Sequence, residues 1–600
     1  MILVCVIAAM SLSAQKWRTH LAYNNVTQIA MADDKVYAIS DGSLYSVEKQ
    51  SEQIKVYNNQ SGLHGTGITC IHYDETGKQL LIGYGTGKID ILKRNSVQYI
   101  SELYTKDMTQ RKTIHNITIS GRTAYLATAF GIQTMDLREN KLVDSYWLRP
   151  GGEETDVQDV LIQNDSIYAF TDDSLYCAAI RDNIVDYTVW RREKAGRIEP
   201  DSEKGKHYQD ATNHWYAGHG EGIVRFPSGG KRTTYKPNGP IVNKPYYITT
   251  SGGTVTILAG GRWTEQDNTP GHVMRYKEGI WRNITRDSIA AQTGLDIVRD
   301  FMTAAIDPNN SNHYFITSYG TGLYEFSGEK CIGHTTANGV ITSAAPDSPQ
   351  RYTRLIGSTY DSAGRLWFLN AANATPIIVK EGDSFYGLPI VADNQTITIH
   401  IPGDIIIDSR NEHLKWITSA YKPSGLMILD DGGTPTDASD DRAFLRREWT
   451  NQHGRSFTPV DLFAIMQDRR GRIWVATEQG AAYIDEGTDF FTSDAIVQPD
   501  LMDNNGENPI TTLRMKAICQ TPDGHLWIGS ETLGVYELNE DATEILGHYT
   551  TDNSAMSANG ILSLAAGDDG HLWIGTAEGL VEYDPNGQDE GIKDGKDDDA

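Results

Sequence analysis

Two glycine-rich segments of this sequence have the composition of phosphate-binding loops, and three histidines have the composition of a metal site. The segments are Gly83-Tyr84-Gly85-Thr86-Gly87 and Gly218-His219-Gly220-Glu221-Gly222, and the histidines are His207, His214 and His219. A phosphate-binding loop opens a helix whose N-terminal amides hold the anion, and neither segment is followed by a helical pattern. Strand alternation and an intervening turn separate the histidines, so no zinc site is predicted.

Catalytic motifs are equally scarce. The sequence has no Gly-x-Ser-x-Gly nucleophile elbow and no His-Glu-x-x-His zinc motif, and its 79 Asp and Glu residues are too many to single out an acid–base pair. After Cys5, the cysteines stand alone without Cys-x-x-Cys spacing and are expected to be buried thiols. They are Cys70, Cys177, Cys331 and Cys519. The sequence therefore predicts neither an enzyme nor a cofactor or metal requirement.

One short string recurs along the whole chain. Its clearest copy is Asp569-Gly570-His571-Leu572-Trp573-Ile574-Gly575-Thr576, and close copies centre on Trp527, Trp474 and Trp367. Weaker copies centre on Tyr37, Leu81, Tyr125, Tyr168, Trp215, Val255, Tyr314 and Trp416. About twelve copies, roughly 40 to 60 residues apart, have the spacing of propeller blades.

Each copy contains the parts of a strand meander: an apolar segment, a tight Gly/Asp turn, a segment with the aromatic residue, a Gly turn and another apolar segment. A fourth strand is visible at 53–57. We expect the second strand to be buried on both faces, with Leu572 and Ile574 towards one neighbouring blade and Trp573 towards the other. Twelve blades exceed the four to eight of one ring. The predicted fold is all-β, with two tandem β-propellers of about six to seven four-stranded blades each.

The expected domains are a signal peptide at 1–15, an N-terminal propeller at 16–287, a C-terminal propeller at 288–585 and an acidic tail at 586–600. The apolar run from Met1 to Met10, followed by small residues up to Ala14, is typical of a cleaved export signal. Export to the cell surface or the periplasm follows. The segment Trp17–Val26 is predicted to be an outer strand that closes a ring with a later blade.

Charge limits the partners. The net charge of -26 disfavours nucleic acid and anionic membranes as general partners. After the signal, no apolar run reaches the ~18 residues of a membrane span.

A ligand site is predicted on the propeller face that carries the turns between second and third strands. These turns combine aromatic and polar residues suited to stacking on sugars and hydrogen bonding to them. The candidates are Tyr84, Phe130, His219, Tyr319, Tyr421, Lys422, Glu478 and Glu531.

Two resemblances give this pattern a biological context. The string from Asp568 to Asp584 resembles the two-component regulator propeller repeat of Bacteroidetes sensor proteins. The N-terminal sequence from Trp17 to Val26, with 36–46, resembles the PorZ family of two-propeller components of the type IX secretion system. That resemblance implies a surface attachment complex with a PorU-like sortase and a role in supplying lipopolysaccharide. The family ends in a β-sandwich sorting domain, whereas this sequence ends after its last repeat, through truncation or because its route to the surface differs.

Three functions are compatible with these observations. The first is a non-enzymatic surface scaffold that supports type IX secretion and sortase-dependent cargo attachment through binding of lipopolysaccharide or another glycan. The alternative is a periplasmic glycan-sensing propeller module of a hybrid two-component system. A propeller lyase or glycosidase is the least favoured because no catalytic constellation stands out.

Overall fold

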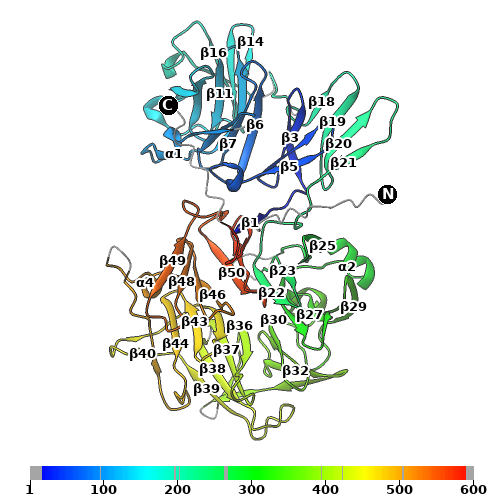
Figure 1. Cartoon of the computed structure of the whole chain (residues 1–600), viewed down its shortest axis with the longest axis vertical. Helices are drawn as coiled ribbons and strands as arrows, with labels where there is room; N and C mark the ends of the chain where they lie inside the picture. The colour runs from blue at the N-terminus through cyan, green and yellow to red at the C-terminus, as the bar shows by residue number, and fades with distance from the viewer. Residues whose placement is uncertain are drawn as a thin grey trace, which may run out of the picture. The chain divides into compact units, whose positions relative to one another are not determined.

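The computed structural model describes residues 16–588 except 95, 195–197, 202, 262–267, 393–394, 422 and 503–505. The predicted signal peptide and most of the predicted tail lie outside the described residues. The chain forms antiparallel sheets in two compact units, Leu21–Gly239 and Pro240–Glu590, and the second unit also includes the N-terminal segment up to His20 (Figure 1). The expected all-β fold of tandem propellers is confirmed. The units divide about one blade earlier than the expected boundary near Asp287.

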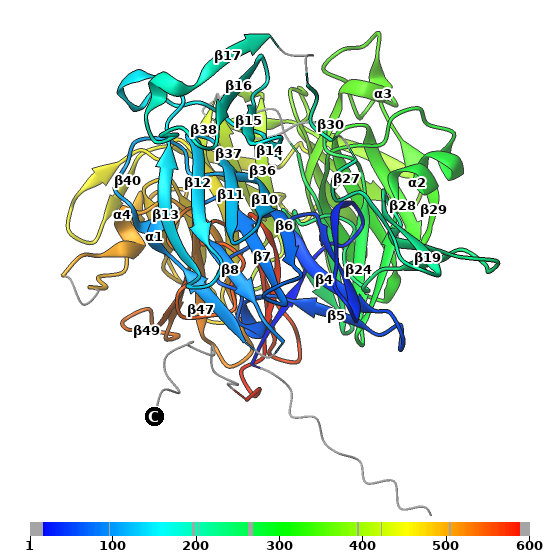
Figure 2. The same ribbon diagram turned by 90° about the horizontal axis from the view of Figure 1, so that it is seen from above.

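The N-terminal propeller has five four-stranded blades among its described residues (Figure 2). In each blade, consecutive strands pair antiparallel, and the first strands of the first four blades lie side by side. The blades are β2 (Val26–Met31), β3 (Lys35–Ser40), β4 (Ser43–Glu48) and β5 (Ile54–Tyr57); β6 (Ile68–Asp74), β7 (Gln79–Tyr84), β8 (Ile89–Leu92) and β9 (Val97–Ile100); β10 (Ile114–Ser120), β11 (Thr123–Thr128), β12 (Gly131–Asp136) and β13 (Lys141–Tyr146); β14 (Asp159–Gln163), β15 (Ser166–Phe170), β16 (Ser174–Ala179) and β17 (Arg191–Lys194); β18 (His207–Gln209), β19 (Asn213–Gly218), β20 (Gly222–Pro227) and β21 (Thr233–Tyr235).

A buried tyrosine closes this five-bladed ring. The Tyr45 hydroxyl donates to the carbonyl of Tyr235 at 3.1 Å and accepts the Ile223 amide at 2.9 Å. Tyr45 also packs in one apolar cluster with Trp215. The fifth blade is therefore fastened to the first by hydrogen bonds as well as by packing.

The C-terminal propeller has seven blades among its described residues. Six follow the chain from β22 to β49, and the seventh takes its outer strand from the N-terminus. The blades are β22 (Tyr247–Ser251), β23 (Thr254–Leu258), β24 (Val273–Lys277) and β25 (Ile280–Ile284); β26 (Phe301–Asp307), β27 (Asn310–Gly320), β28 (Gly322–Ser327) and β29 (Lys330–Thr335); β30 (Thr353–Tyr360), β31 (Leu366–Asn370), β32 (Ile377–Glu381) and β33 (Ser384–Leu388); β36 (Ile401–Ile407), β37 (Leu414–Tyr421), β38 (Ser424–Asp430) and β39 (Arg442–Arg446); β42 (Leu462–Gln467), β43 (Ile473–Thr477) and β44 (Gly480–Ile484); β46 (Met515–Gln520), β47 (Leu526–Ser530), β48 (Val535–Leu538) and β49 (Ile545–Tyr549); β50 (Ile561–Ala566), β51 (Leu572–Thr576), β52 (Gly579–Tyr583) and β1 (Trp17–His20).

Short strands and helices lie in the segments that connect the blade strands. The remaining strands are β34 (Ile390–Ala392), β35 (Gln395–Ile397), β40 (Trp449–Asn451), β41 (Ser456–Phe457) and β45 (Ala495–Ile496). The helices are α1 (Glu102–Thr105), α2 (Arg286–Thr293), α3 (Pro349–Tyr352) and α4 (Pro509–Thr512), with single 3-10 turns at Asn59–Ser61, Pro150–Gly152 and Tyr187–Val189. In the described part of the chain, no helix is long and apolar enough to cross a membrane.

All twelve predicted second strands are present, each containing the residue on which its copy centres. In β51, Leu572 and Ile574 join the core shared with Trp527, whereas Trp573 joins the core shared with β22 and β23. The expected two-sided burial is therefore confirmed. The blades divide as five and seven, so the first ring is smaller than predicted.

A side chain ahead of the second strand anchors its tryptophan. The indole N–H groups of Trp367 and Trp474 donate to the carboxylates of Asp361 and Asp468, both at 2.9 Å. In β47 the acceptor is the Thr521 hydroxyl, at 3.1 Å from the Trp527 indole nitrogen. The acceptor precedes the tryptophan by six residues, and this contact satisfies a polar group that burial removes from water.

The N-terminal strand completes the seventh blade, as predicted from the sequence. Trp17 pairs with Tyr583 in the ladder between β1 and β52, and its ring lies 4.7 Å from the Tyr583 ring. Three residues on, the buried His20 Nε2 lies 3.0 Å from Glu582 Oε2. Burial opposes ionisation of Glu582, but hydrogen bonds to His20 and His571 lower its pKa to about 2. The ring is thus closed by aromatic packing and by a buried carboxylate with histidine partners.

The four cysteines of the described chain are buried and form no disulfide, as the sequence predicted. Burial raises the pKa of the Cys70 thiol to about 12 and that of Cys331 to about 11. Both thiols are therefore protonated at neutral pH and are poor nucleophiles.

Candidate functional site

A cavity of about 530 Å³ lies on the axis of the C-terminal propeller. Its lining includes residues from the first strand of every blade, namely β22, β26, β30, β36, β42, β46 and β50. Glu531 and Ala577, which follow the second strands β47 and β51, also line it. The cavity thus lies at the propeller face that carries the turns between second and third strands.

Bulges in the first strands supply several of the cavity's side chains. In β42 the pairing with β43 shifts between Leu462 and Ala464, so Phe463 has no partner in the ladder. Lys516 in β46 and Leu562 in β50 occupy the same position in their strands. An extra residue turns the strand locally and re-aims its side chain. Met302 in β26 follows the same pattern, so bulge positions of several blades contribute residues to the cavity.

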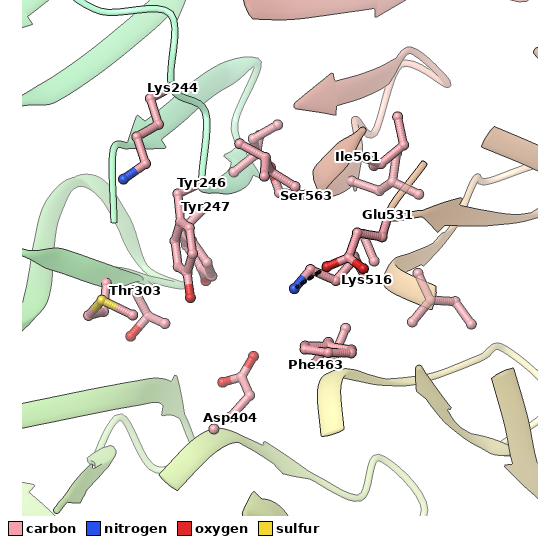
Figure 3. Close-up of a pocket in the computed structure, with 18 of the residues that line it drawn as sticks. Lys244, Tyr246, Tyr247, Thr303, Asp404, Phe463, Lys516, Glu531, Ile561 and Ser563 are labelled. Atoms are coloured by element: carbon pink, nitrogen blue, oxygen red, sulfur yellow. Dashed lines mark ion pairs between the residues drawn. The ribbon is translucent and has the colours of Figure 1, made fainter. Parts of the chain in front are cut away.

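One wall of the cavity is basic and aromatic. The ammonium of Lys516 lies 3.8 Å from the centroid of the Phe463 ring and 3.6 Å from Glu531 Oε1 (Figure 3). The second oxygen of Glu531 lies 2.8 Å from Arg514 Nε. Two cations therefore share one carboxylate, and the Lys516 ammonium is directed into the hollow.

The adjacent blade, through β36, carries Asp404 (Figure 3). Its Oδ1 accepts the Ile405 amide at 2.9 Å, and its own amide donates to the Thr418 hydroxyl at 2.8 Å. Among the described residues, no lysine, arginine or histidine forms an ion pair with Asp404. Burial raises the pKa of this carboxyl to about 6. The cavity therefore contains a carboxylate without a neutralising cation.

Tyrosines form the third side. Tyr246 and Tyr247 lie together at the cavity, with a hydroxyl group directed towards Asp404 (Figure 3). The Tyr247 hydroxyl also donates to the carbonyl of Ala304 at 3.3 Å. Burial raises the pKa of Tyr247, so its hydroxyl stays protonated. Aromatic rings with a few converging polar groups are typical of a small-molecule binding site.

The lining offers no activated nucleophile among its described residues. The Ser563 hydroxyl donates to the carbonyl of Pro245 at 2.6 Å, which orients it away from any base. The Lys244 ammonium contacts the Thr269 hydroxyl at 3.3 Å. The arrangement is suited to holding a ligand through stacking, hydrogen bonds and charge.

Glu531 is the only predicted site residue that lines the cavity among those whose side chains are described. Tyr84 is fully buried, with its hydroxyl 2.6 Å from Asp90 Oδ2, and Phe130 is fully buried in the core beside Trp147. Tyr319 is 4% exposed and packs in the core near the axis. These three aromatic rings lie at or just after the ends of second strands and are buried between blades. They therefore stabilise the fold and are inaccessible to a glycan.

The other predicted residues lie apart from the cavity. His219 is exposed, with Nδ1 2.5 Å from the Asn25 side-chain oxygen, at the closure of the five-bladed ring. Glu478 accepts the amides of Val460 and Asp461 at 2.8 and 2.9 Å and so holds the start of β42. Tyr421 ends β37, and the Tyr421 side chain and Lys422 lie outside the described residues.

The sequence analysis did not identify Asp404, Phe463 or Lys516. Each sits in the first strand of a blade, where Asp404 and Lys516 interrupt an apolar segment, whereas Phe463 is itself apolar and does not stand out. The interruption was a usable signal, because a bulge residue in an otherwise buried strand needs a place for a different side chain.

This fold and site define a tandem β-propeller protein with regulator-type repeats. Residues 456–479 and 509–532 match the family model of the two-component regulator propeller. Residues 36–191 match the model of the type IX secretion system PorZ N-terminal β-propeller domain. Both resemblances expected from the sequence are confirmed.

Among solved structures, PorZ of Porphyromonas gingivalis aligns with a TM-score of 0.82 at 23% identity, over 95% of this chain and 87% of that chain. The P. gingivalis PorZ is an essential bacterial surface component of the type IX secretion system. The extracellular domain of a putative hybrid two-component system from B. thetaiotaomicron aligns at 13% identity over 95% of this chain and 83% of that chain, with a TM-score of only 0.30. No curated protein sequence matches this chain.

Proposed function

We propose that this protein is a non-enzymatic surface component of a type IX secretion system that binds a glycan in the axial cavity of its C-terminal propeller. The likeness to PorZ across nearly the whole chain supports the first part. The cavity, with aromatic rings beside Lys516, Asp404 and Glu531, supports the second. The protein acts as a scaffold for a PorU-like sortase and holds surface lipopolysaccharide for attachment to cargo.

A capture experiment from intact cells tests the scaffold role. The tagged protein, cross-linked on whole cells, is expected to co-purify with a sortase and other secretion components. Recovery with a sensor kinase instead would favour the glycan-sensing alternative. Protease added to intact cells should digest the protein if it is at the surface, with a periplasmic protein as the protected control.

Binding of purified lipopolysaccharide tests the ligand role. Calorimetry should detect binding by the wild type and a weaker affinity for Phe463→Ala, because the ring offers a stacking surface inside the cavity. The matched control is Phe226→Ala, which removes an exposed ring from the N-terminal propeller. Equal affinities for all three proteins would place glycan binding elsewhere.

A further inference from the structure

The axial cavity has a second chemical feature beyond its aromatic rings: an acidic group that faces a basic one. Asp404 and Lys516 point into the hollow from different walls (Figure 3). Lys516 is already balanced by Glu531, at 3.6 Å. Asp404 forms no ion pair with the described residues. Among the described residues that line the cavity, Asp404 is therefore the carboxylate whose charge a ligand cation could balance.

Asp404 is also held in a fixed position. Its backbone lies in a bulge of β36, where pairing with β37 shifts between Pro402 and Ile405. The Ile405 amide occupies one carboxylate oxygen, and the Thr418 hydroxyl holds the Asp404 amide. Gly357 of β30 approaches so closely that a Cβ there would lie 3.2 Å from the Asp404 Cα. A side chain fixed by neighbours on two blades is pre-organised for binding.

A partly buried carboxylate without a cation is costly unless a ligand provides one. The titratable groups that line the hollow with Asp404 are Tyr246 and Tyr247, Lys244, whose ammonium contacts the Thr269 hydroxyl at 3.3 Å, and Lys516 with its partner Glu531. A ligand cation seated on Asp404 would also lie near the tyrosine rings, whose faces attract positive charge. The site thus favours a cation at one end and hydroxyl or acidic oxygens at the Lys516 end.

We propose that the axial cavity selects a sugar unit with a free, positively charged amino group, which pairs with Asp404 while the sugar ring packs against Phe463 and the tyrosines. This inference rests on the proposed glycan binding and specifies which glycan unit enters the cavity. An N-acetylated amine has no charge and should bind more weakly.

The test compares three probes by calorimetry at pH 7: methyl glucosaminide, its N-acetyl derivative and methyl glucoside. The wild type should bind the free amine at least tenfold more tightly than the other two. Asp404→Asn should remove that preference, and Asp383→Asn, at an exposed turn between β32 and β33, should retain it. The preference should also fall about tenfold at pH 5, where a carboxyl with a pKa of about 6 is only about one-tenth ionised.

Each outcome is decisive. Equal affinity for the three probes, or a preference that survives in Asp404→Asn, overturns the amino-sugar inference. If lipopolysaccharide still binds and Phe463→Ala weakens it, the proposed glycan binding stands without the amino-sugar preference. If neither lipopolysaccharide nor any of the probes binds, both proposals fail. Circular dichroism of Asp404→Asn verifies that the variant is folded.

Discussion

The two propellers differ in what occupies their axes. In the five-bladed ring, Lys204 reaches the axis and its ammonium lies 2.7 Å from both Asp159 Oδ1 and the Thr118 hydroxyl. The Gln28 side chain accepts the Ile71 amide at 2.9 Å, joining the first blade to the second. In the seven-bladed ring the corresponding strands enclose a cavity of about 530 Å³. Polar side chains thus link the first strands of the smaller ring, whereas in the larger ring Asp404 and Lys516 line a cavity.

The difference follows from blade number. Fewer blades bring the first strands closer to the axis, so a few side chains can span it; more blades leave space that side chains do not fill. The same bulge occurs in both rings, for example at Thr69 in β6 and at Phe463 in β42. In the smaller ring the Thr69 hydroxyl bonds to the carbonyl of Ile114, at 2.5 Å. The same kind of bulge therefore links two blades in one ring and places a side chain at the cavity of the other.

The largest effect is expected where the seventh blade meets the first. Trp573 is 4% exposed and packs against Tyr276 of β24, with ring centroids 5.4 Å apart. Trp573→Ala should lower the free energy of unfolding of the C-terminal propeller by about 3 to 5 kcal/mol, measured by chemical denaturation. Leu546→Ala, at a side chain that is 42% exposed, is the control. An unchanged midpoint for Trp573→Ala would contradict its placement in the core.

The next effect tests which ring the N-terminal strand belongs to. Trp17 packs against Tyr549 and Tyr583 of the C-terminal propeller. Trp17→Ala should cost about 3 kcal/mol and raise hydrogen exchange in β50 to β52, because the blade loses the anchor of its outer strand. Exchange in β2 to β5 should stay unchanged. Increased exchange in the N-terminal propeller alone would show that the strand stabilises the other ring.

The sequence was sufficient to identify the blades, but not how they close into rings. Turn glycines and a buried aromatic residue mark each second strand, and these signals are local. Closure depends on contacts between distant segments, such as the Thr250 hydroxyl with the carbonyl of Ala566 at 2.7 Å. Such a contact is not visible in the sequence of either segment, so the observed division after Gly239 into five and seven blades could not be derived from the repeat pattern alone.

The sequence indicated which face of the propeller carries the candidate site, but it identified few of the residues that line it. The turns after the second strands border the cavity through Glu531 and Ala577. Tyr84 and Phe130 occupy equivalent turns but fold back into the core. Whether a turn residue points inward depends on the space between blades, which sequence periodicity does not encode. The bulge residues Lys516 and Phe463 needed the strand pairing to be recognised.

A smaller effect on stability is expected from two carboxylates, Asp404 within β36 and Asp408 directly after it. Asp404 has a raised pKa of about 6, and the pKa of Asp408 is lowered to about 2, although burial opposes this, by hydrogen bonds from Arg410, Gln467 and Trp416. A raised pKa stabilises the fold at low pH, and this stability is lost as pH rises from about 4 to 6. Asp408 has the opposite sign: its stabilisation is present above about pH 4 and is lost as pH falls towards 2.

Asp404→Asn should therefore stabilise the C-terminal propeller by about 2 kcal/mol at pH 7 and have little effect at pH 4. Thermal unfolding at both pH values measures this difference. Asp408→Asn, the matched change, should destabilise the propeller at pH 7. Stabilisation of equal size at pH 4 and pH 7 would show that Asp404 is not the titrating group.

The smallest effect tests the comparison of the two axes directly. Lys204→Met removes a cation whose partner Asp159 is only 12% exposed, so it leaves a mostly buried carboxylate without its ion pair. We expect a loss of about 1 to 2 kcal/mol in the N-terminal propeller. Lys516→Met is the matched change in the other ring, where Glu531 is 40% exposed and keeps Arg514. There the loss should be at most about 1 kcal/mol, because exposed ion pairs contribute little. Hydrogen exchange of β10 and β14, compared with β42 and β46, reports the two changes separately. An equal loss in both rings would mean that Lys516 supports the fold as Lys204 does, and would argue against a cavity whose side chains are reserved for a ligand.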